Sequence, residues 1–225
     1  RWLACHPERF TETTAPATPD LAALKALHIR DLTAWQDAAY ARRYSDLIDR
    51  AEARLGGATD GSAEAFLRTL MQGTRQVMAY KDEYEVARLH TDPDFLQSLA
   101  AGYEGTPRLT FHLAPPILPG RDLRTGRPKK RAFGPWILLV FRGLARMKRL
   151  RGTPFDLFGL SRERVEERRL RDDYLAAMSR LIDTLDTSPD GLADATKRAA
   201  AVLDVVGFGP VKAANLARFR ARGIV

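Results

Sequence analysis

Cysteine is almost absent from this sequence, since Cys5 is the only one among 225 residues. A single cysteine excludes a disulfide framework, a four-cysteine zinc site and an iron–sulfur cluster held by this chain alone. The four histidines are scattered, without the spacing of metal ligands. We therefore expect no metal and no cofactor in this segment. A reducing compartment such as the cytoplasm is compatible with this composition.

Catalytic and membrane motifs are missing as well. The sequence contains no glycine-rich phosphate-binding loop, no serine-nucleophile elbow and no zinc-protease motif. No apolar run approaches the ~20 residues that a membrane-spanning helix needs. We therefore predict no catalytic residue in this chain and no membrane contact.

Acidic residues are scarce in one segment. Between Arg121 and Arg151 there are eleven Lys and Arg residues against a single acid, Asp122. The formal net charge of +8 arises there, because the rest of the chain is close to balanced. Such a run binds phosphates of a nucleic acid, a nucleotide or coenzyme A, or faces an acidic domain or solvent. Its candidate contacts are Arg127, Lys129, Lys130 and Arg131.

Helical periodicity dominates what the sequence does contain, which predicts a mainly α, bundle-like domain. The expected helices cover about 21–27, 31–55, 60 or 62 to 89, a stretch from 93, 134–150, 161–185, 190–204 and 210–222. Alternating residues predict one short strand or small β-hairpin around 108–113. Residues 1–20, rich in Thr, Pro and Ala, are predicted to be an arm from a preceding domain. Residues 21–225 then form one accessory domain of a longer protein.

Charge falls on a helix face that should be apolar between Met78 and Leu89. Apolar side chains at spacings of three and four mark this face over residues 67–77. The same spacing then reaches Lys81, Tyr84 and Arg88, with Asp82, Glu83 and Glu85 beside them. One interpretation is a solvated face with a Lys81–Glu85 pair worth ~0.2–0.5 kcal/mol. The other is a paired network at an interface, which fits the phase of the stripe better.

His112 is a further candidate for this binding or interface network. It lies near the end of the expected strand, shortly before the double proline at 115–116. A strand end holds a side chain rigidly, which suits a binding role. The alternative is a histidine that is hydrogen-bonded within its own loop.

A turn near the C-terminus suggests a second, competing function. The residues Gly207-Phe208-Gly209-Pro210, followed by a helix with a basic start, resemble the helix-hairpin-helix of DNA-binding proteins. Glycines at a helix N-terminus expose backbone amides to phosphate. The same turn is also a simple way to close a pair of short helices. A DNA-binding module that uses 207–216 and 121–151 is therefore the second hypothesis.

Six passages together resemble one family. They are Ala34–Tyr44, Met78–Leu89, Arg108–Pro116, Lys130–Trp136, Arg151–Asp156 and Gly207–Lys212. In this order they resemble the C-terminal domain of the long, fused indolepyruvate ferredoxin oxidoreductases of bacteria. The resemblance covers nearly the whole chain, and the Met78–Leu89 run and His112-Leu113-Ala114-Pro115-Pro116 are its most specific parts.

This resemblance implies a large cytoplasmic parent enzyme that oxidatively decarboxylates aryl 2-oxo acids to acyl-coenzyme A. The parent is expected to use thiamine diphosphate, magnesium and iron–sulfur clusters, to pass electrons to ferredoxin and to form a homo-oligomer. Motifs for these cofactors are absent here, so the segment itself is expected to be catalytically inactive. We expect it to serve assembly, interdomain packing on the catalytic domains, or docking of a cofactor or ferredoxin. The basic segment 121–151 is expected to meet a neighbouring subunit, the phosphates of coenzyme A or an acidic ferredoxin.

Overall fold

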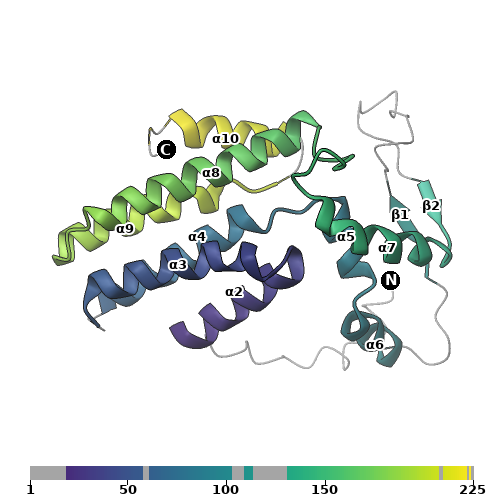
Figure 1. Cartoon of the computed structure of the whole chain (residues 1–225), viewed down its shortest axis with the longest axis horizontal. Coiled ribbons are helices and arrows are strands. Elements are labelled where there is room, and N and C mark those ends of the chain that lie inside the picture. The colour runs from purple at the N-terminus through teal and green to yellow at the C-terminus, as the bar shows by residue number, and fades with distance from the viewer. Residues whose placement is uncertain are drawn as a thin grey trace, which may run out of the picture.

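A computed structural model describes residues 19–57, 61–102, 109–113, 131–207, 210–221 and 223. Within these residues the chain is mainly helical, with one two-stranded antiparallel hairpin, which confirms the predicted fold class. Figure 1 shows long helices running alongside one another and a group of short elements at one end. The predicted arm lies almost wholly outside the described residues.

The long helices form a bundle, and the short elements form what we call the end unit. The bundle consists of α2 (Leu21–Trp35), α3 (Ala38–Leu55), α4 (Gly61–Met78), α8 (Arg162–Asp183), α9 (Pro189–Ala200) and α10 (Pro210–Ala221). The end unit consists of α5 (Glu83–His90), α6 (Pro93–Ala101), β1 (Phe111–Leu113), β2 (Arg131–Phe133) and α7 (Ile137–Arg146). Two 3-10 helices, η2 (Met147–Leu150) and η3 (Ala201–Asp204), follow α7 and α9.

Helix α4 is the centre of the bundle, because it contacts α2, α3, α8 and α9. Its fully buried side chains include Phe66, Leu70 and Met71. It comes close to α9 at Gly73, where a β-carbon would collide with the Tyr174 hydroxyl and lie 3.0 Å from the Ala199 carbonyl oxygen. The absence of a side chain at this position therefore allows the two helices to pack tightly.

Helix starts follow the predicted capping residues in two places. Asp92 accepts a hydrogen bond from the Asp94 amide at 3.0 Å, and Pro93 occupies the first turn of α6. Ser161 accepts one from the Arg164 amide at 3.3 Å at the start of α8. Such caps satisfy amides that have no partner inside the helix.

The expectation of one helix over 31–55 is wrong. Helix α2 ends at Trp35, and α3 begins after its N-cap residue Asp37. The Asp37 carboxylate accepts a hydrogen bond from the Tyr40 amide at 2.8 Å. The side chain of Asp37 thus competes with continued helix, as short polar side chains do. The first helix consequently extends to Trp35 instead of ending near Leu27.

The expectation of one helix from about residue 60 to Leu89 is also wrong. In a continuous helix, the carbonyls of Met78 and Tyr80 would accept amides four residues later. Here the Tyr40 hydroxyl donates to the Met78 carbonyl at 2.8 Å, and the Trp35 indole donates to the Tyr80 carbonyl at 3.0 Å. Asp82 then caps α5 by accepting from the Glu85 amide at 2.8 Å. Side chains from α2 and α3 therefore replace the helical bonds at this break.

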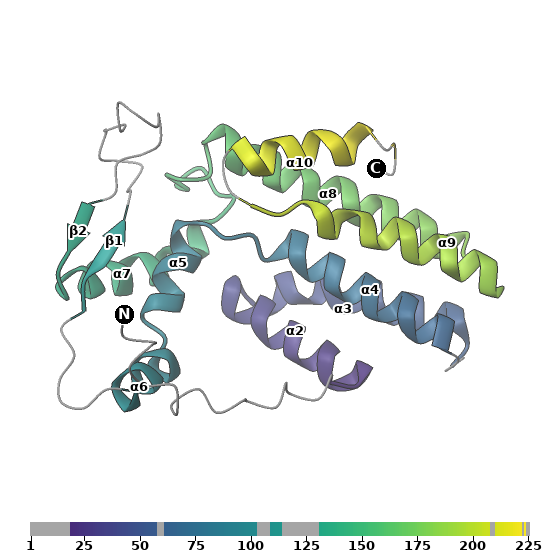
Figure 2. The ribbon, with the colours of Figure 1, turned by 180° about the vertical axis from the view of Figure 1, so that it is seen from behind.

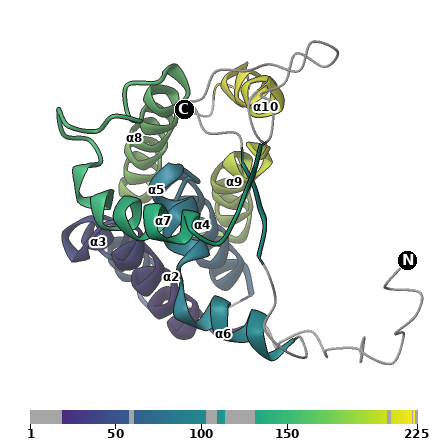
Figure 3. The ribbon, with the colours of Figure 1, turned by 90° about the vertical axis from the view of Figure 1, so that its right-hand side faces the viewer.

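The end unit has a small core of its own, built on α5 and α7. Ala87, Ile137 and Phe141 are buried there. His90 stacks on Phe141 with 5.6 Å between ring centroids. Figure 2, seen from behind, and Figure 3, along the bundle, show α5 and α7 across the end of the long helices.

The hairpin confirms the strand predicted around 108–113 and adds a partner that the sequence did not reveal. Its antiparallel register pairs Phe111 with Phe133 and Leu113 with Arg131. The described strand is shorter than predicted, since it covers only Phe111–Leu113. Residues 114–130, between the strands, lie outside the described part of the chain.

Candidate functional site

Four of the five candidates for the binding or interface network lie in or just before α5, after the break that follows α4. Lys81 is exposed just before the helix, whereas Tyr84 is buried with 1% of its surface exposed. Glu85 and Arg88 are half-buried and pair with each other, the Arg88 Nη2 lying 2.7 Å from Glu85 Oε1. His112 lies apart from them, exposed on β1.

The centre of this region is an ion pair between Asp82 and Arg151. The Arg151 Nε donates to Asp82 Oδ2 at 2.6 Å, and Nη2 donates to Oδ1 at 2.7 Å. Both side chains are 3–4% exposed. A buried pair of this kind holds because two parallel charge-assisted bonds satisfy both ions. It joins the start of α5 to the segment that follows η2.

Arg151 also caps the end of α2. Its Nη1 donates to the Trp35 carbonyl, and its guanidinium carbon lies 3.9 Å from the centre of a Trp35 ring. The Lys148 ammonium donates to the Ala34 carbonyl beside it. Burial, and next the charge of Arg151, lower the pKa of Lys148. Two cations thus meet the negative end of the α2 dipole, which stabilises both the helix end and the contact.

Asp156 organises the loop of residues 151–160, which we call the junction loop. Its Oδ1 accepts from the Tyr84 hydroxyl at 3.1 Å and from the Gly159 amide at 2.9 Å. Its Oδ2 accepts from the Gly152 amide at 3.0 Å. Gly152 has φ of +73°, and a β-carbon on Gly159 would collide with the Asp156 carboxylate. Both positions therefore require glycine.

Burial, and next the neighbouring Asp156 charge, raise the pKa of Tyr84. Tyr84 therefore stays protonated and remains a hydrogen-bond donor at physiological pH. We refer to Trp35, Asp82, Tyr84, Arg151 and Asp156 as the junction network. It ties α2, α5 and the junction loop together.

The apolar side chains of the junction loop divide into one that contacts the junction network and three that face solvent. Phe158 turns inward, and its ring centroid lies 5.3 Å from that of Tyr84. Phe155, Leu157 and Leu160 turn outward and are 73%, 72% and 79% exposed. The loop thus exposes three large apolar side chains to solvent, while its backbone amides at Gly152 and Gly159 are bonded to Asp156. Such an arrangement is typical of a contact surface.

A second set of ions links α5, α8 and α10. Glu83 lies 3.4 Å from Arg164, and Arg164 in turn pairs with the buried Glu167. Lys212 of α10 pairs with the other oxygen of Glu167. The basic start of the helix-hairpin-helix-like segment therefore already has an anionic partner. Phe208 and Gly209, at the tip of that turn, lie outside the described residues.

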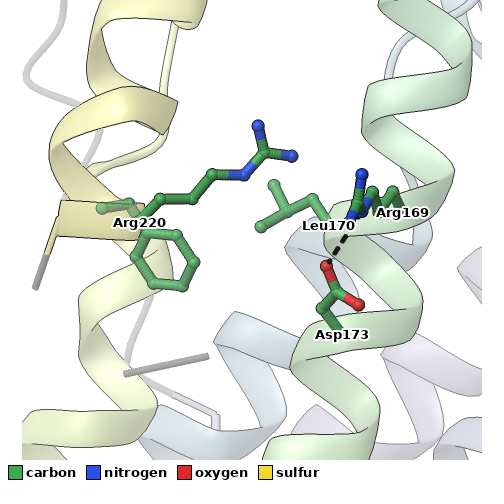
Figure 4. A pocket seen from close by; sticks show the side chains of 5 residues that line it. Arg169, Leu170, Asp173 and Arg220 are labelled. Carbon is green, nitrogen blue, oxygen red and sulfur yellow. Dashed lines mark ion pairs between the residues drawn. The ribbon is translucent and has the colours of Figure 1, made fainter. Parts of the chain in front are cut away.

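Shallow grooves run between α8 and α10. One of about 480 Å³ is lined by Glu163, Leu170, Lys212 and Leu216, among others. The neighbouring groove of about 350 Å³ contains Leu170 between the Arg169–Asp173 pair of α8 and Arg220 of α10 (Figure 4). In this second groove, Arg169 pairs with Asp173, and Arg220 pairs with Glu166. The described residues that line the two grooves include no nucleophile beside a base.

The junction network bonds mainly within itself. Its carboxylates and guanidinium bond to each other and to the backbone. Within the described ranges, no three His, Cys, Asp or Glu side chains gather as a metal site would require. No helix among them has the length and apolarity to cross a membrane.

Most of the predicted phosphate contacts cannot be placed. Arg127, Lys129 and Lys130 lie outside the described residues, and Arg131 is exposed at the start of β2. The later part of the basic segment divides into two roles. Lys148 and Arg151 turn inward to α2, whereas Arg142, Arg146 and Arg149 are exposed.

The model of a protein family of unknown function, DUF6537, matches residues 21–223. The chain belongs to the DUF6537 family. No curated protein and no solved structure matches it. The match begins at the first residue of α2 and spans every helix and strand described above. The bundle and the end unit are therefore both part of the DUF6537 domain.

Sequence reasoning misses the pairs that build the DUF6537 junction. Asp82 belongs to the charged cluster, but its partner Arg151 is 69 positions away, and Tyr84 meets Asp156 across 72 positions. Spacing along one helix cannot reveal such pairs. One local signal is available, because Asp156 is framed by Gly152 and Gly159 in a segment without helical periodicity. An acid between glycines there is typical of a loop closed by a carboxylate.

Proposed function

We propose that this DUF6537 chain is an assembly domain, without catalysis of its own, of a thiamine-diphosphate-dependent 2-oxoacid oxidoreductase of the indolepyruvate ferredoxin type. The resemblance of six sequence passages supports this membership. Three of those passages, Ala34–Tyr44, Met78–Leu89 and Arg151–Asp156, supply every member of the junction network. The resemblance thus includes residues that meet in space.

The observation that carries the assembly role is the exposure of Phe155, Leu157 and Leu160 on the junction loop. Exposed apolar area does not stabilise a free domain. The loop nevertheless has a defined backbone, held by three hydrogen bonds to Asp156. A surface that is ordered before binding loses little conformational entropy when a partner covers it. We propose that the catalytic domains of the parent cover this loop.

Charged residues that flank Tyr84 in the chain complete the proposed interface. Lys81 is exposed at the start of α5, and Tyr84 supports the loop from beneath. Glu85 and Arg88 compensate each other's charge, so this side of α5 presents little net charge. An apolar loop beside compensated charges is typical of the core and rim of a protein–protein interface.

The chemistry of the parent is also part of the proposal. Thiamine diphosphate, magnesium and iron–sulfur clusters would be bound by domains other than this one, and coenzyme A and ferredoxin would serve the parent as acyl and electron acceptors. A cytoplasmic homo-oligomer is the proposed form of the parent. This domain would contribute by holding the catalytic domains in their assembled arrangement.

The test uses the full-length protein that carries this domain. Indolepyruvate-dependent reduction of a viologen dye reports membership of the enzyme class, and its absence would refute that membership. The variant Phe155→Ser, Leu157→Ser, Leu160→Ser then tests the docking loop. We expect faster release of the 21–223 domain by limited proteolysis, with about tenfold or greater acceleration as the contact is lost.

The matched control is Val206→Ser with Val211→Ser, since these side chains are 56% and 61% exposed and do not belong to the junction loop. The control should leave the proteolysis rate unchanged. Equal rates for the native protein and the loop variant, in an enzyme that does reduce the dye, would refute the docking surface while leaving the membership intact.

A further inference from the structure

One face of α7 and η2 carries three arginines in a line. Arg142, Arg146 and Arg149 are separated by four and then three positions, so they share one side of the helix. All three are exposed, while Ile137 and Phe141 turn the opposite side of α7 into the core of the end unit. We call these three residues the arginine stripe.

The arginine stripe has no acidic partner in the described part of the chain. Each of the other arginines Arg43, Arg50 and Arg75 has one, respectively Asp172, Asp183 and Asp31. The ion pairs of the described residues include none of the stripe, and no acid occurs in the sequence from Arg131 to Phe155. Three uncompensated like charges on one face repel one another and favour an anionic partner.

Apolar side chains extend the stripe toward the start of α7. Leu139 is 68% exposed and precedes Arg142 by three positions and Arg146 by seven, so it lies on the same face. Trp136 and Val140 flank it, 58% and 45% exposed. Trp and Arg are the residue types that most often dominate binding energy at protein interfaces.

We infer that the outward face of α7 and η2 docks an acidic protein segment that also carries an apolar side chain. The arginines match carboxylates in charge and in bidentate geometry. Leu139 and Trp136 match an apolar anchor. This surface shares no residue with the junction loop and stands independently of the proposed function.

Other anionic partners fit the same face less well. Nucleic-acid interfaces are strongly polar and charged, and they would leave the aliphatic Leu139 and Val140 without a matching surface. A helix that lies on a membrane turns its apolar face toward the lipid. The buried face of α7, with Ile137 and Phe141, is already used in the core of the end unit.

The test is binding of a fluorescein-labelled helical peptide of about 20 residues, with Glu on one face and Leu between the glutamates. The full chain should bind this probe, and the affinity should fall as salt rises, because the contact is charged. The variant Arg142→Glu, Arg146→Glu, Arg149→Glu should weaken binding at least about tenfold. Leu139→Ser should weaken binding about threefold or more while leaving the salt dependence unchanged.

A matched variant separates a specific stripe from diffuse positive charge. Arg30, Arg180 and Arg218 are exposed on other helices, and their replacement by Glu gives the same formal net charge. The control should retain probe binding within about twofold. Equal weakening in both triple variants, or no binding of the probe below millimolar concentration, would overturn the inference. Tighter, stripe-dependent binding of duplex DNA or of anionic phosphatidylserine vesicles would overturn it as well.

Discussion

At the scale of single residues, Arg151 has the largest expected effect on stability. Its guanidinium bonds twice to the buried Asp82 and once to the end of α2. Arg151→Met would leave the Asp82 carboxylate buried without a cation. We expect the free energy of unfolding to fall by about 3–5 kcal/mol. Urea denaturation followed by circular dichroism measures this loss.

The control is Arg149→Met, two positions earlier, since Arg149 is exposed and belongs to none of the described ion pairs. Its effect should stay within about 0.5 kcal/mol. Adding Asp82→Asn to Arg151→Met should recover part of the loss, because the orphaned charge is removed. A loss below about 1 kcal/mol for Arg151→Met would show that the pair contributes little.

His28 gives the domain a defined pH dependence. The side chain is 6% exposed, and its Nδ1 lies 3.0 Å from the Tyr44 hydroxyl. Burial, and next the charge of Arg75, lower the pKa of His28 to about 4. The unfolded chain therefore binds the proton more readily than the folded one. The stabilisation is fully present above pH ~6.5 and is lost as the pH falls toward the folded value.

We expect this loss to be roughly 2–3 kcal/mol between neutral pH and pH ~4. His28→Gln should flatten the corresponding slope of unfolding free energy against pH. His112→Gln, the same change at an exposed histidine, is the control for the substitution itself. An unchanged slope in His28→Gln would assign the acid sensitivity to other groups.

Residue-level prediction from sequence succeeds where partners are near in the chain. Glu85 and Arg88 are predicted to be neighbours, and they form an ion pair three positions apart. Asp82 with Arg151, and Tyr84 with Asp156, could not be predicted, since no helical period relates them. Lys81 is expected on the same helix face, but α4 ends at Met78, so helical spacing no longer determines the position of Lys81.

At the scale of elements, two helical glycines should respond in opposite ways to the same substitution. Gly73 lies where α4 meets α9, and a methyl group there would displace the Tyr174 hydroxyl from the Ala199 carbonyl. Gly143 lies in α7, where an added β-carbon would meet no atom within 4 Å. Gly73→Ala should lower the unfolding free energy by about 1–3 kcal/mol through overpacking.

Gly143→Ala should instead raise it by about 0.5–1 kcal/mol, because alanine lowers the entropy cost of forming the helix. Thermal denaturation of the two variants gives both signs in one experiment. A destabilised Gly143→Ala or a neutral Gly73→Ala would contradict the helix packing described here.

Helix starts are easier to predict from sequence than helix breaks. Asp92 with Pro93 and Ser161 are local signals, and the helices begin there. The break between α4 and α5 depends on two side chains from other helices. Trp35 of α2 donates to the Tyr80 carbonyl, and Tyr40 of α3 donates to the Met78 carbonyl. Because these donors are distant in sequence, periodicity alone continues the helix through the break.

At the scale of the whole molecule, a buried ion pair links the bundle to the end unit. Arg151 bonds to Asp82 at the start of α5 and to the Trp35 carbonyl at the end of α2. The mainly α class and the hairpin follow from the sequence pattern. The outward loop could not be predicted, because the exposure of Phe155, Leu157 and Leu160 depends on Asp156 and Tyr84 beneath them. The sequence shows only an apolar-rich segment there, which equally fits a buried turn.

The most direct test of this account is amide hydrogen exchange at Gly159, measured by NMR on the native chain. Its amide donates to Asp156 Oδ1 at 2.9 Å and is buried within the junction loop. We predict exchange at least about a hundredfold slower than in an unstructured peptide, and at least about tenfold faster exchange in Asp156→Ala, which keeps only the main-chain acceptor at residue 156. Exchange of the native Gly159 amide at the unstructured rate would contradict a junction loop held in place for docking.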